Sequence, residues 1–408
     1  MKSLILIFAL TSFLILQVSL SESYQLTQLG KVGLNEVSLL RYIEAEDGIK
    51  AMDISNDGSC LAIGGRGFIR IYSTNGDEWV YKFNERVDSL SISSTGELLA
   101  VGTEEAMIYL FHKSSSKPIL RYNAEGPVLS ISFSDDGKYF YAGTFGGTFY
   151  LFEASTLNLI WKFKAEGNVA ILALSTSFNG NRATAGVSDN SIIIFSKASS
   201  SPLWKGKTEG YIRSIAMSSD GTLTIAGGND SSIYFIDLGC EVSIKKYMAS
   251  SSVRAVALSS SGSQAVAGSE DGSIYFFERF NPSWVFNAED TVSSVAISSD
   301  GKYLCAGSFN KKLYFFFSAI NSPLFIYPVK HPISHVAISS NGDKIAISAG
   351  RMAYLLKAEL TKAKENHQTP IYVWAVMEGF ILAALSLIWL RIRFKKAGQS
   401  MKLLYLST

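Results

Sequence analysis

Carboxylates recur at two positions along the chain, and their spacing could build a binding surface. A glutamate stands two or three residues before the first apolar residue of six segments that we expect to be β-strands, and three aspartates occupy short turns between later strands. If these segments surround an axis, both sets project from one face, where they would attract cations or a basic protein surface. The candidate residues are Glu46, Glu85, Glu125, Glu166, Glu209, Glu289, Asp189, Asp230 and Asp271.

The same carboxylates have a second interpretation, in which the repeats carry them only as solvated turn residues. Lys50, Arg213 and Arg254 lie close enough to neutralise part of the charge. Exposed ion pairs of this kind contribute little to stability. Both interpretations stay open, because spacing alone does not show how the charges pair.

A further candidate is Glu378, which lies within the apolar stretch 371–390. An ionised carboxyl at the centre of a membrane costs on the order of 2.5–3.5 kcal/mol, so such a group is usually protonated or paired. Ala375, Gly379 and Ala383 form a stripe of small residues beside it, which would let two helices approach closely. We expect this segment to associate with a second copy or with a membrane segment of a partner. The alternative is a plain anchor that tolerates one polar residue.

A repeat of about 40 residues organises the elements that must position the acidic loops. Each copy contains four short apolar segments, with an Asp-Gly, Asn-Gly or similar pair between the first two. Such pairs suit tight turns between antiparallel strands, and four antiparallel strands per repeat are typical of a propeller blade. The turn glycines are Gly58, Gly96, Gly137, Gly180, Gly221, Gly262, Gly301 and Gly342.

The last repeat lacks its fourth strand, whereas residues 37–43 form a strand without a preceding partner. Pairing of this strand with residues 352–357 would close the ring and remove two open sheet edges. We therefore predict an all-β fold, an eight-bladed β-propeller over residues 37–357 that is closed by an N-terminal strand. The aromatic third strands, such as Ile274-Tyr275-Phe276-Phe277, are predicted to be core.

The motif Asp-Gly-x-x-x-Ala-x-Gly-Ser-x-Asp-x-x-Ile-Tyr-x-Phe resembles the WD-repeat β-propellers over most of residues 37–357. Asp189, Asp230 and Asp271 match the turn aspartate of that family. No repeat carries the family's Gly-His pair, and no third strand ends in Trp-Asp. The resemblance implies a propeller that binds proteins.

Residues 73–79 and 154–161 resemble a second family, the quinoprotein-like propellers, in which a tryptophan docks one blade on the next. The enzymes of that family typically carry two adjacent cysteines near the cofactor, and this chain has no such pair. The resemblance therefore implies the fold without the redox chemistry, and we expect no cofactor.

The two ends of the sequence have the composition of targeting and membrane segments. A basic residue followed by an apolar run is typical of a signal peptide, and basic residues directly after the second apolar stretch place the tail in the cytoplasm. The propeller is then extracellular or lumenal on a single-pass membrane protein. The expected segments are 1–23 signal peptide, 24–36 lead-in, 358–370 juxtamembrane linker, 371–390 transmembrane α-helix and 391–408 basic cytoplasmic tail.

Composition argues against several other classes of function. The net charge of +2 offers no basic surface for nucleic acid. Cys60, Cys240 and Cys305 are an odd set without a Cys-x-x-Cys pair, so we expect buried thiols rather than a disulfide. The four histidines lack a metal-ligand spacing, and we expect no metal site.

We conclude from the sequence that the chain is a membrane-anchored, non-catalytic scaffold for protein interaction or assembly. Its partners would bind the propeller face and the transmembrane helix. Two alternatives remain. In the first, the propeller channel is used by a small-ligand or cation receptor or by a quinoprotein-like enzyme. In the second, the chain is a sensor subunit that is coupled to a partner through its transmembrane helix.

Overall fold

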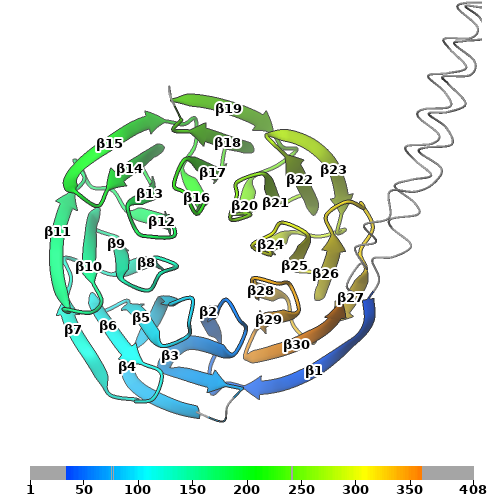
Figure 1. Cartoon of the computed structure of the whole chain (residues 1–408), viewed down its shortest axis with the longest axis horizontal. Coiled ribbons are helices and arrows are strands. Elements are labelled where there is room, and N and C mark those ends of the chain that lie inside the picture. The colour runs from blue at the N-terminus through cyan, green and yellow to red at the C-terminus, as the bar shows by residue number, and fades with distance from the viewer. Residues whose placement is uncertain (1–33, 75, 77, 240–241, 361–408) are drawn as a thin grey trace, which may run out of the picture. The chain divides into compact units, whose positions relative to one another are not determined.

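The computed structural model describes residues 34–360, except for residues 75, 77, 240 and 241. The regular elements of these residues are all β-strands. The strands stand in sheets around a central axis, and each four-stranded sheet has one edge strand nearest the axis and the other at the rim (Figure 1). The described residues therefore form a β-propeller, as predicted.

The strands occupy four positions between the axis and the rim. The inner strands are β2 (Ile49–Ile54), β8 (Val128–Phe133), β12 (Ile171–Thr176), β16 (Ile212–Met217), β20 (Val253–Leu258), β24 (Val292–Ile297) and β28 (Ile333–Ile338). Two longer strands run through two positions each: β3 (Cys60–Ser73) is a second and then a third strand, and β4 (Glu78–Ile92) is an outer strand before residue 87 and an inner strand from there on. The second strands are β5 (Leu98–Thr103), β9 (Tyr139–Thr144), β13 (Arg182–Val187), β17 (Leu223–Gly228), β21 (Gln264–Ser269), β25 (Tyr303–Ser308) and β29 (Lys344–Ala349). The third strands are β6 (Met107–His112), β10 (Thr148–Glu153), β14 (Ser191–Ser196), β18 (Ser232–Asp237), β22 (Ser273–Glu278), β26 (Lys312–Phe317) and β30 (Met352–Leu360). The outer strands are β1 (Leu34–Glu44), β7 (Pro118–Asn123), β11 (Asn158–Lys164), β15 (Ser199–Lys207), β19 (Ser243–Met248), β23 (Asn281–Asn287) and β27 (Phe325–Pro328).

The number of sheets differs from the prediction. The described strands form seven sheets, six with four strands and one with six, in the order β2-β3-β4-β5-β6-β7. In the larger sheet β3 (Cys60–Ser73) pairs first with β2 and then with β4 (Glu78–Ile92), and β4 continues into its pairing with β5. The two repeats nearest the N-terminus are therefore continuous in one sheet. The prediction of eight blades is wrong, because the propeller has seven sheets.

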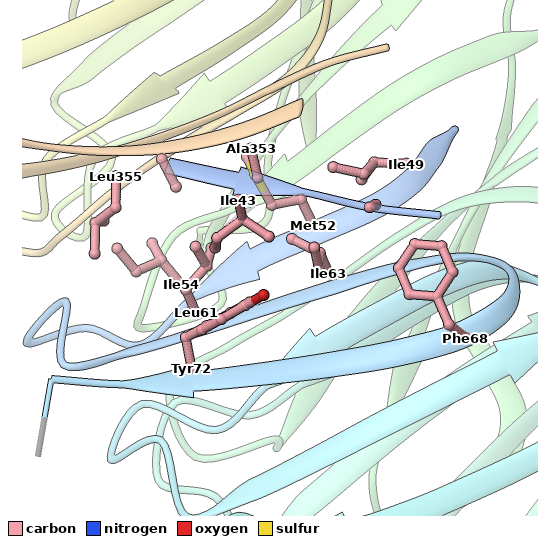
Figure 2. Packing of buried hydrophobic residues seen from close by; sticks show 12 residues of the cluster. Ile43, Ile49, Met52, Ile54, Leu61, Ile63, Phe68, Tyr72, Ala353 and Leu355 are labelled. Carbon is pink, nitrogen blue, oxygen red and sulfur yellow. The ribbon is translucent and has the colours of Figure 1, made fainter. Parts of the chain in front are cut away.

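The predicted closure by an N-terminal strand is confirmed. β1 pairs antiparallel with β30, so that residues from the two ends of the propeller share one sheet. Ile43 of β1 lies opposite Ala353 and is almost fully buried. Figure 2 shows Ile43 in a cluster with residues of β2, β3 and β30, including Ile54 and Leu355. The closing strand is thus attached both by hydrogen bonds and by a shared apolar core.

Glycine and β-branched residues explain how neighbouring sheets approach each other. A Cβ atom placed on Gly143 would lie 2.4 Å from Cγ2 of Ile171 on the next inner strand, so this position excludes any side chain. Third-strand aromatics fill the rest of the space, as the stacked rings of Phe149 and Phe195, with centroids 4.5 Å apart, illustrate. The prediction that the third-strand aromatics are core is confirmed, since Phe149, Phe195 and Phe276 are fully buried.

Several predicted segments lie outside the described residues. They are the signal peptide, most of the lead-in, the basic tail, and the linker and transmembrane helix over 361–390. Between residues 34 and 360 the structure contains no helix, and so none that could cross a membrane. The described fold is all-β, as predicted, and the predicted fold class is corrected in its number of blades, which is seven rather than eight.

Candidate functional site

The predicted carboxylates do lie on one face of the propeller. The loops that lead into the inner strands meet the turns between second and third strands there: Thr208 N donates to Asn190 O at 2.7 Å, beside Glu209 and Asp189. We call this end the loop face. It comprises the loops 45–48, 124–127, 165–170, 208–211, 249–252, 288–291 and 329–332, residues 84–86 within β4, and the turns 104–106, 145–147, 188–190, 229–231, 270–272 and 309–311.

Tyrosines of the third strands hold the acidic loops in place. The Glu125 N–H donates to the hydroxyl of Tyr150 at 2.8 Å, and the Glu209 N–H donates to the hydroxyl of Tyr234 at 3.2 Å. The sequence pattern predicts these tyrosines only as core residues. The tyrosine recurs at the same position of the Ile-Tyr-x-Phe pattern, and this recurrence could have indicated its second role, the contact with the loops. The tyrosines whose hydroxyls contact the loops are Tyr109, Tyr150, Tyr234, Tyr275 and Tyr314.

Lysines on the outer and third strands pair with most of the predicted carboxylates. Lys162 holds the pKa of Glu125 below its usual range. These pairs are largely exposed, so each contributes little to stability, but together they offset much of the negative charge of the loop face. The prediction that the ring attracts cations or a basic partner stays a prediction. The pairs are Glu46–Lys82 (2.9 Å), Glu125–Lys162, Asp189–Lys207 (2.9 Å), Glu209–Lys246 (2.7 Å) and Glu289–Lys312 (3.6 Å).

The remaining predicted carboxylates have mainly local partners. Glu85 accepts hydrogen bonds from the hydroxyls of Thr103 and Tyr109. Within their turns, Asp230 accepts a hydrogen bond from Tyr234 Oη at 2.5 Å, and Asp271 accepts one from Ser273 N at 3.0 Å. Glu166 is exposed.

Two arginines, rather than the carboxylate ring, line the mouth of the axial channel at the loop face. A cavity of about 620 Å³ lies there. Arg213 of β16 and Arg254 of β20 enter it and share one carboxylate, that of Glu270, at 3.6 and 3.2 Å. The guanidinium of Arg254 also lies over the ring of Phe309, 5.4 Å from its centroid. Two cations with one anion leave this mouth positively charged, which suits a carboxylate or another anion.

His335 lines the same cavity from β28. Its Nδ1 lies 3.1 Å from Ser348 Oγ. Burial, assisted by the charge of Lys50, lowers the pKa of His335 to about 4. The imidazole is therefore neutral at pH 7 and adds no charge to the mouth. Among the described residues, no group of three or more histidine, cysteine or acidic side chains could hold a metal ion.

The opposite face, which we call the turn face, is built from the turns between inner and second strands. Backbone hydrogen bonds join neighbouring turns around the axis: Ser219 N donates to Ser260 O, Ser260 N to Ser299 O, and Ser299 N to Ser340 O, all at 2.9–3.0 Å. The series continues from Ser340 N to Asn56 O at 2.7 Å. The repeat pattern predicts the turns but not these bonds, because the pattern of one repeat does not show its contacts with the next.

A second cavity, of about 370 Å³, lies at the turn face and is lined by all the inner strands. Its lining includes Asp53 and Asp135. Burial raises the pKa of Asp53 to about 6, although N–H groups of Ile92 and Ile54 donate to its carboxylate. Burial also raises the pKa of Asp135. Neither residue was singled out from the sequence.

Other predicted residues are accounted for as follows. Cys60 and Cys305 are free and buried, which confirms that prediction, and burial raises the pKa of each thiol to about 12. Cys240 lies outside the described residues. The predicted association residues of the membrane segment also lie outside them: Ala375, Glu378, Gly379 and Ala383.

Tryptophans dock one repeat on the next, as the quinoprotein-like segments predicted. Trp161 Nε1 donates to the carbonyl of Lys197 at 2.9 Å, and Trp79 Nε1 donates to the carbonyl of Lys113 at 2.6 Å. Trp284 makes an equivalent bond to Ser318 O at 2.7 Å. Each bond joins an outer strand to the turn that follows the next third strand.

Comparison with known families agrees with this geometry. A family model described as outer membrane protein assembly factor BamB matches residues 66–275, just over half of the chain. The chain belongs to this family. A second model, WD domain, G-beta repeat, matches residues 280–316. No match was found among curated proteins. Both resemblances predicted from the residues, to WD-repeat and to quinoprotein-like propellers, are therefore confirmed.

Proposed function

We propose that the chain is a non-catalytic assembly scaffold whose propeller binds a partner protein at the loop-face mouth of its axial channel. The description of the matching family, an outer membrane protein assembly factor, supports an assembly role. The WD-repeat match supports the same class, because these propellers serve mainly in protein binding.

The arginine pair at the mouth carries this proposal. Arg213 and Arg254 compete for the single carboxylate of Glu270, so a second carboxylate supplied by a partner would complete their hydrogen bonding. About two thirds of each arginine side chain is shielded from solvent. A charge pair formed there is less screened than one at the rim.

Exposed aromatic side chains extend the same surface. Phe145, in the turn after β9, is 59% exposed, and Phe309, beside Arg254, is 37% exposed. Phenylalanine and arginine are enriched in the centres of protein interfaces. We therefore expect the partner segment to carry a carboxylate side chain next to apolar residues.

Replacement of both arginines tests the proposal. The full chain with Arg213→Gln and Arg254→Gln is crosslinked in its native membranes, and the amount of the main crosslinked partner is compared with the wild type. We expect a loss of about tenfold or more, since each charged hydrogen bond contributes roughly 1.5–3 kcal/mol. The matched control is Arg121→Gln on the rim, where the arginine donates to Tyr81 Oη at 3.0 Å. Equal partner recovery in the double variant and the control would contradict the proposal.

Membrane attachment is a second part of the proposal, and the sequence alone supports it. The apolar residues 371–390, followed by basic residues, favour attachment with the propeller extracellular or lumenal. Protease treatment of sealed membranes should leave the propeller accessible only from the extracytoplasmic side. Release of the intact chain by alkaline carbonate would contradict attachment.

A further inference from the structure

The cavity at the turn face has two chemically different halves. Side chains that accept hydrogen bonds occupy one half, whereas alanines occupy the equivalent positions of the other inner strands. The polar half contains Asp53, Ser91, Ser132 and Ser175 at these positions, and Asp135 lines the cavity beside them. The alanine half contains Ala216, Ala257, Ala296 and Ala337.

The polar side chains cap backbone N–H groups that point toward the axis. Asp53 Oδ2 accepts from Ile92 N at 2.8 Å, and Ser91 Oγ accepts from Phe133 N at 3.2 Å. In each case a side chain on one inner strand satisfies the N–H of the next. This capping replaces the partner strand that an inner edge lacks.

The alanine half cannot provide such caps. Ser259 N donates to Gln264 O within its own sheet, so the preceding N–H, that of Leu258, points the opposite way, toward the axis. The residue at the capping position for Leu258 N is Ala216, on the preceding inner strand. In the same way, Ala257 faces Ile297 N, and Ala296 faces Ile338 N. Among the described residues, no side chain caps these three N–H groups. They are hydrogen-bond donors that face the cavity.

We propose that this cavity binds a free α-amino acid. Its ammonium group lies between the carboxylates of Asp53 and Asp135, and its carboxylate accepts hydrogen bonds from the uncapped N–H groups of the alanine half. The cavity volume of about 370 Å³ is within the range of small-molecule sites. Both carboxyls line the cavity, and the charge of Asp135 contributes to the raised pKa of Asp53. An ammonium group between them would offset this repulsion and favour their ionised forms.

Binding should depend on pH through these two carboxyls. Of the described residues that line the cavity, Asp53 and Asp135 are the titratable ones. The lining residues from the other inner strands are serine, threonine, asparagine or apolar. The pKa of Asp53 is raised to about 6, so below pH 6 the carboxyl is increasingly neutral and loses its attraction for ammonium. Affinity should therefore fall as the pH is lowered from 7 to 5.

The test uses the purified full chain in mild detergent and isothermal titration calorimetry at pH 7.5. Each of the twenty amino acids is titrated, together with ethanolamine, which lacks the carboxylate, and glycolate, which lacks the amine. We expect at least one amino acid to bind about tenfold or more tightly than both fragments, because each fragment leaves one half of the site unused. Failure of every amino acid to bind at 10 mM would overturn the proposal, as would equal binding of ethanolamine.

Three variants then assign the two halves. Asp53→Asn and Asp135→Asn should each weaken amino-acid binding about tenfold, whereas Asp300→Asn, in a turn of the same face but outside the cavity lining, should leave it unchanged. Ala257→Ser should install the missing cap on Ile297 N and abolish the preference for an amino acid over ethanolamine. Unchanged affinity in both aspartate variants, or an unchanged preference in Ala257→Ser, would contradict the assignment. This ligand is independent of the partner proposed for the loop face.

Discussion

Removal of the Ile43 side chain should measure how much the closing strand contributes to the propeller. Ile43 is 3% exposed and packs with residues of β2, β3 and β30 (Figure 2). Its replacement by alanine removes apolar contacts on both sides of the closure and leaves a cavity. Substitutions of this kind in cores cost about 2–5 kcal/mol. The closure should therefore weaken by an amount that is large compared with a surface change.

The expected change in melting temperature follows from the size of the domain. Unfolding entropy is about 2.1 cal/mol/K per residue, so over residues 34–360 a loss of about 3 kcal/mol lowers Tm by about 4 °C. The matched control is Leu40→Ala on the same strand, where the side chain is 43% exposed. A surface substitution should change stability by less than about 0.5 kcal/mol, and Tm by less than about 1 °C.

The assay is thermal unfolding of the full chain, followed by tryptophan fluorescence. The reasoning predicts a fall of Tm in Ile43→Ala that is several times the fall in Leu40→Ala. Equal falls in the two variants would refute it, because β1 would then be a peripheral strand rather than part of the closing core.

Three further predictions follow from individual contacts. Trp161→Phe removes the donor to Lys197 O and should cost about 1–3 kcal/mol of unfolding free energy; denaturant titration would show this, and an unchanged midpoint would count against tryptophan docking. Tyr234→Phe removes the hydroxyl that accepts from Glu209 N, so amide hydrogen exchange at Glu209 should be faster than in the wild type. Exchange at Glu125, whose N–H is held by Tyr150, should not change. An unchanged exchange rate at Glu209 would argue against the tyrosine contact. Between pH 4 and 6 the native Asp53 holds a proton that the unfolded chain has released, so its contribution to stability falls as pH rises, by up to about 3 kcal/mol. His335 is neutral when folded but protonated when unfolded between pH 4 and 6.5, so its contribution rises with pH over that window. In Asp53→Asn the free energy of unfolding should therefore rise with pH, and in His335→Gln it should fall with pH. Denaturant titration of both variants from pH 4 to 8 measures this, and two coinciding profiles would contradict it.

The repeat made most of the fold predictable. Turn glycines and alternating strand patterns report on contacts inside one repeat, and they gave the bounds of β8 and β28 to the residue. The closing strand was predictable because 37–43 had no local partner. The count of sheets was not, since the continuity of β3 and β4 depends on hydrogen bonds across what the pattern treats as a repeat boundary.

The candidate sites were predictable in part. Sequence spacing brought Glu125, Glu209 and Asp189 to one face, but it did not show that lysines on outer strands pair with them. For Arg213 and Arg254 the sequence predicted only that they neutralise part of the acidic charge, not that they line the mouth of the channel. The uncapped N–H groups of the turn face could not be predicted, because a missing cap depends on the residue that the neighbouring inner strand presents.

The central claim is that a partner protein docks at the loop-face mouth, and site-specific photocrosslinking tests it most directly. A photoreactive phenylalanine analogue replaces Phe309 at the loop face or, as a matched control, Phe178 at the turn face, which is 51% exposed. The account predicts a crosslinked partner from position 309 that disappears when Arg213→Gln and Arg254→Gln are added, and none from position 178. A partner captured at position 178 alone, or one at position 309 that persists without the two arginines, would contradict it.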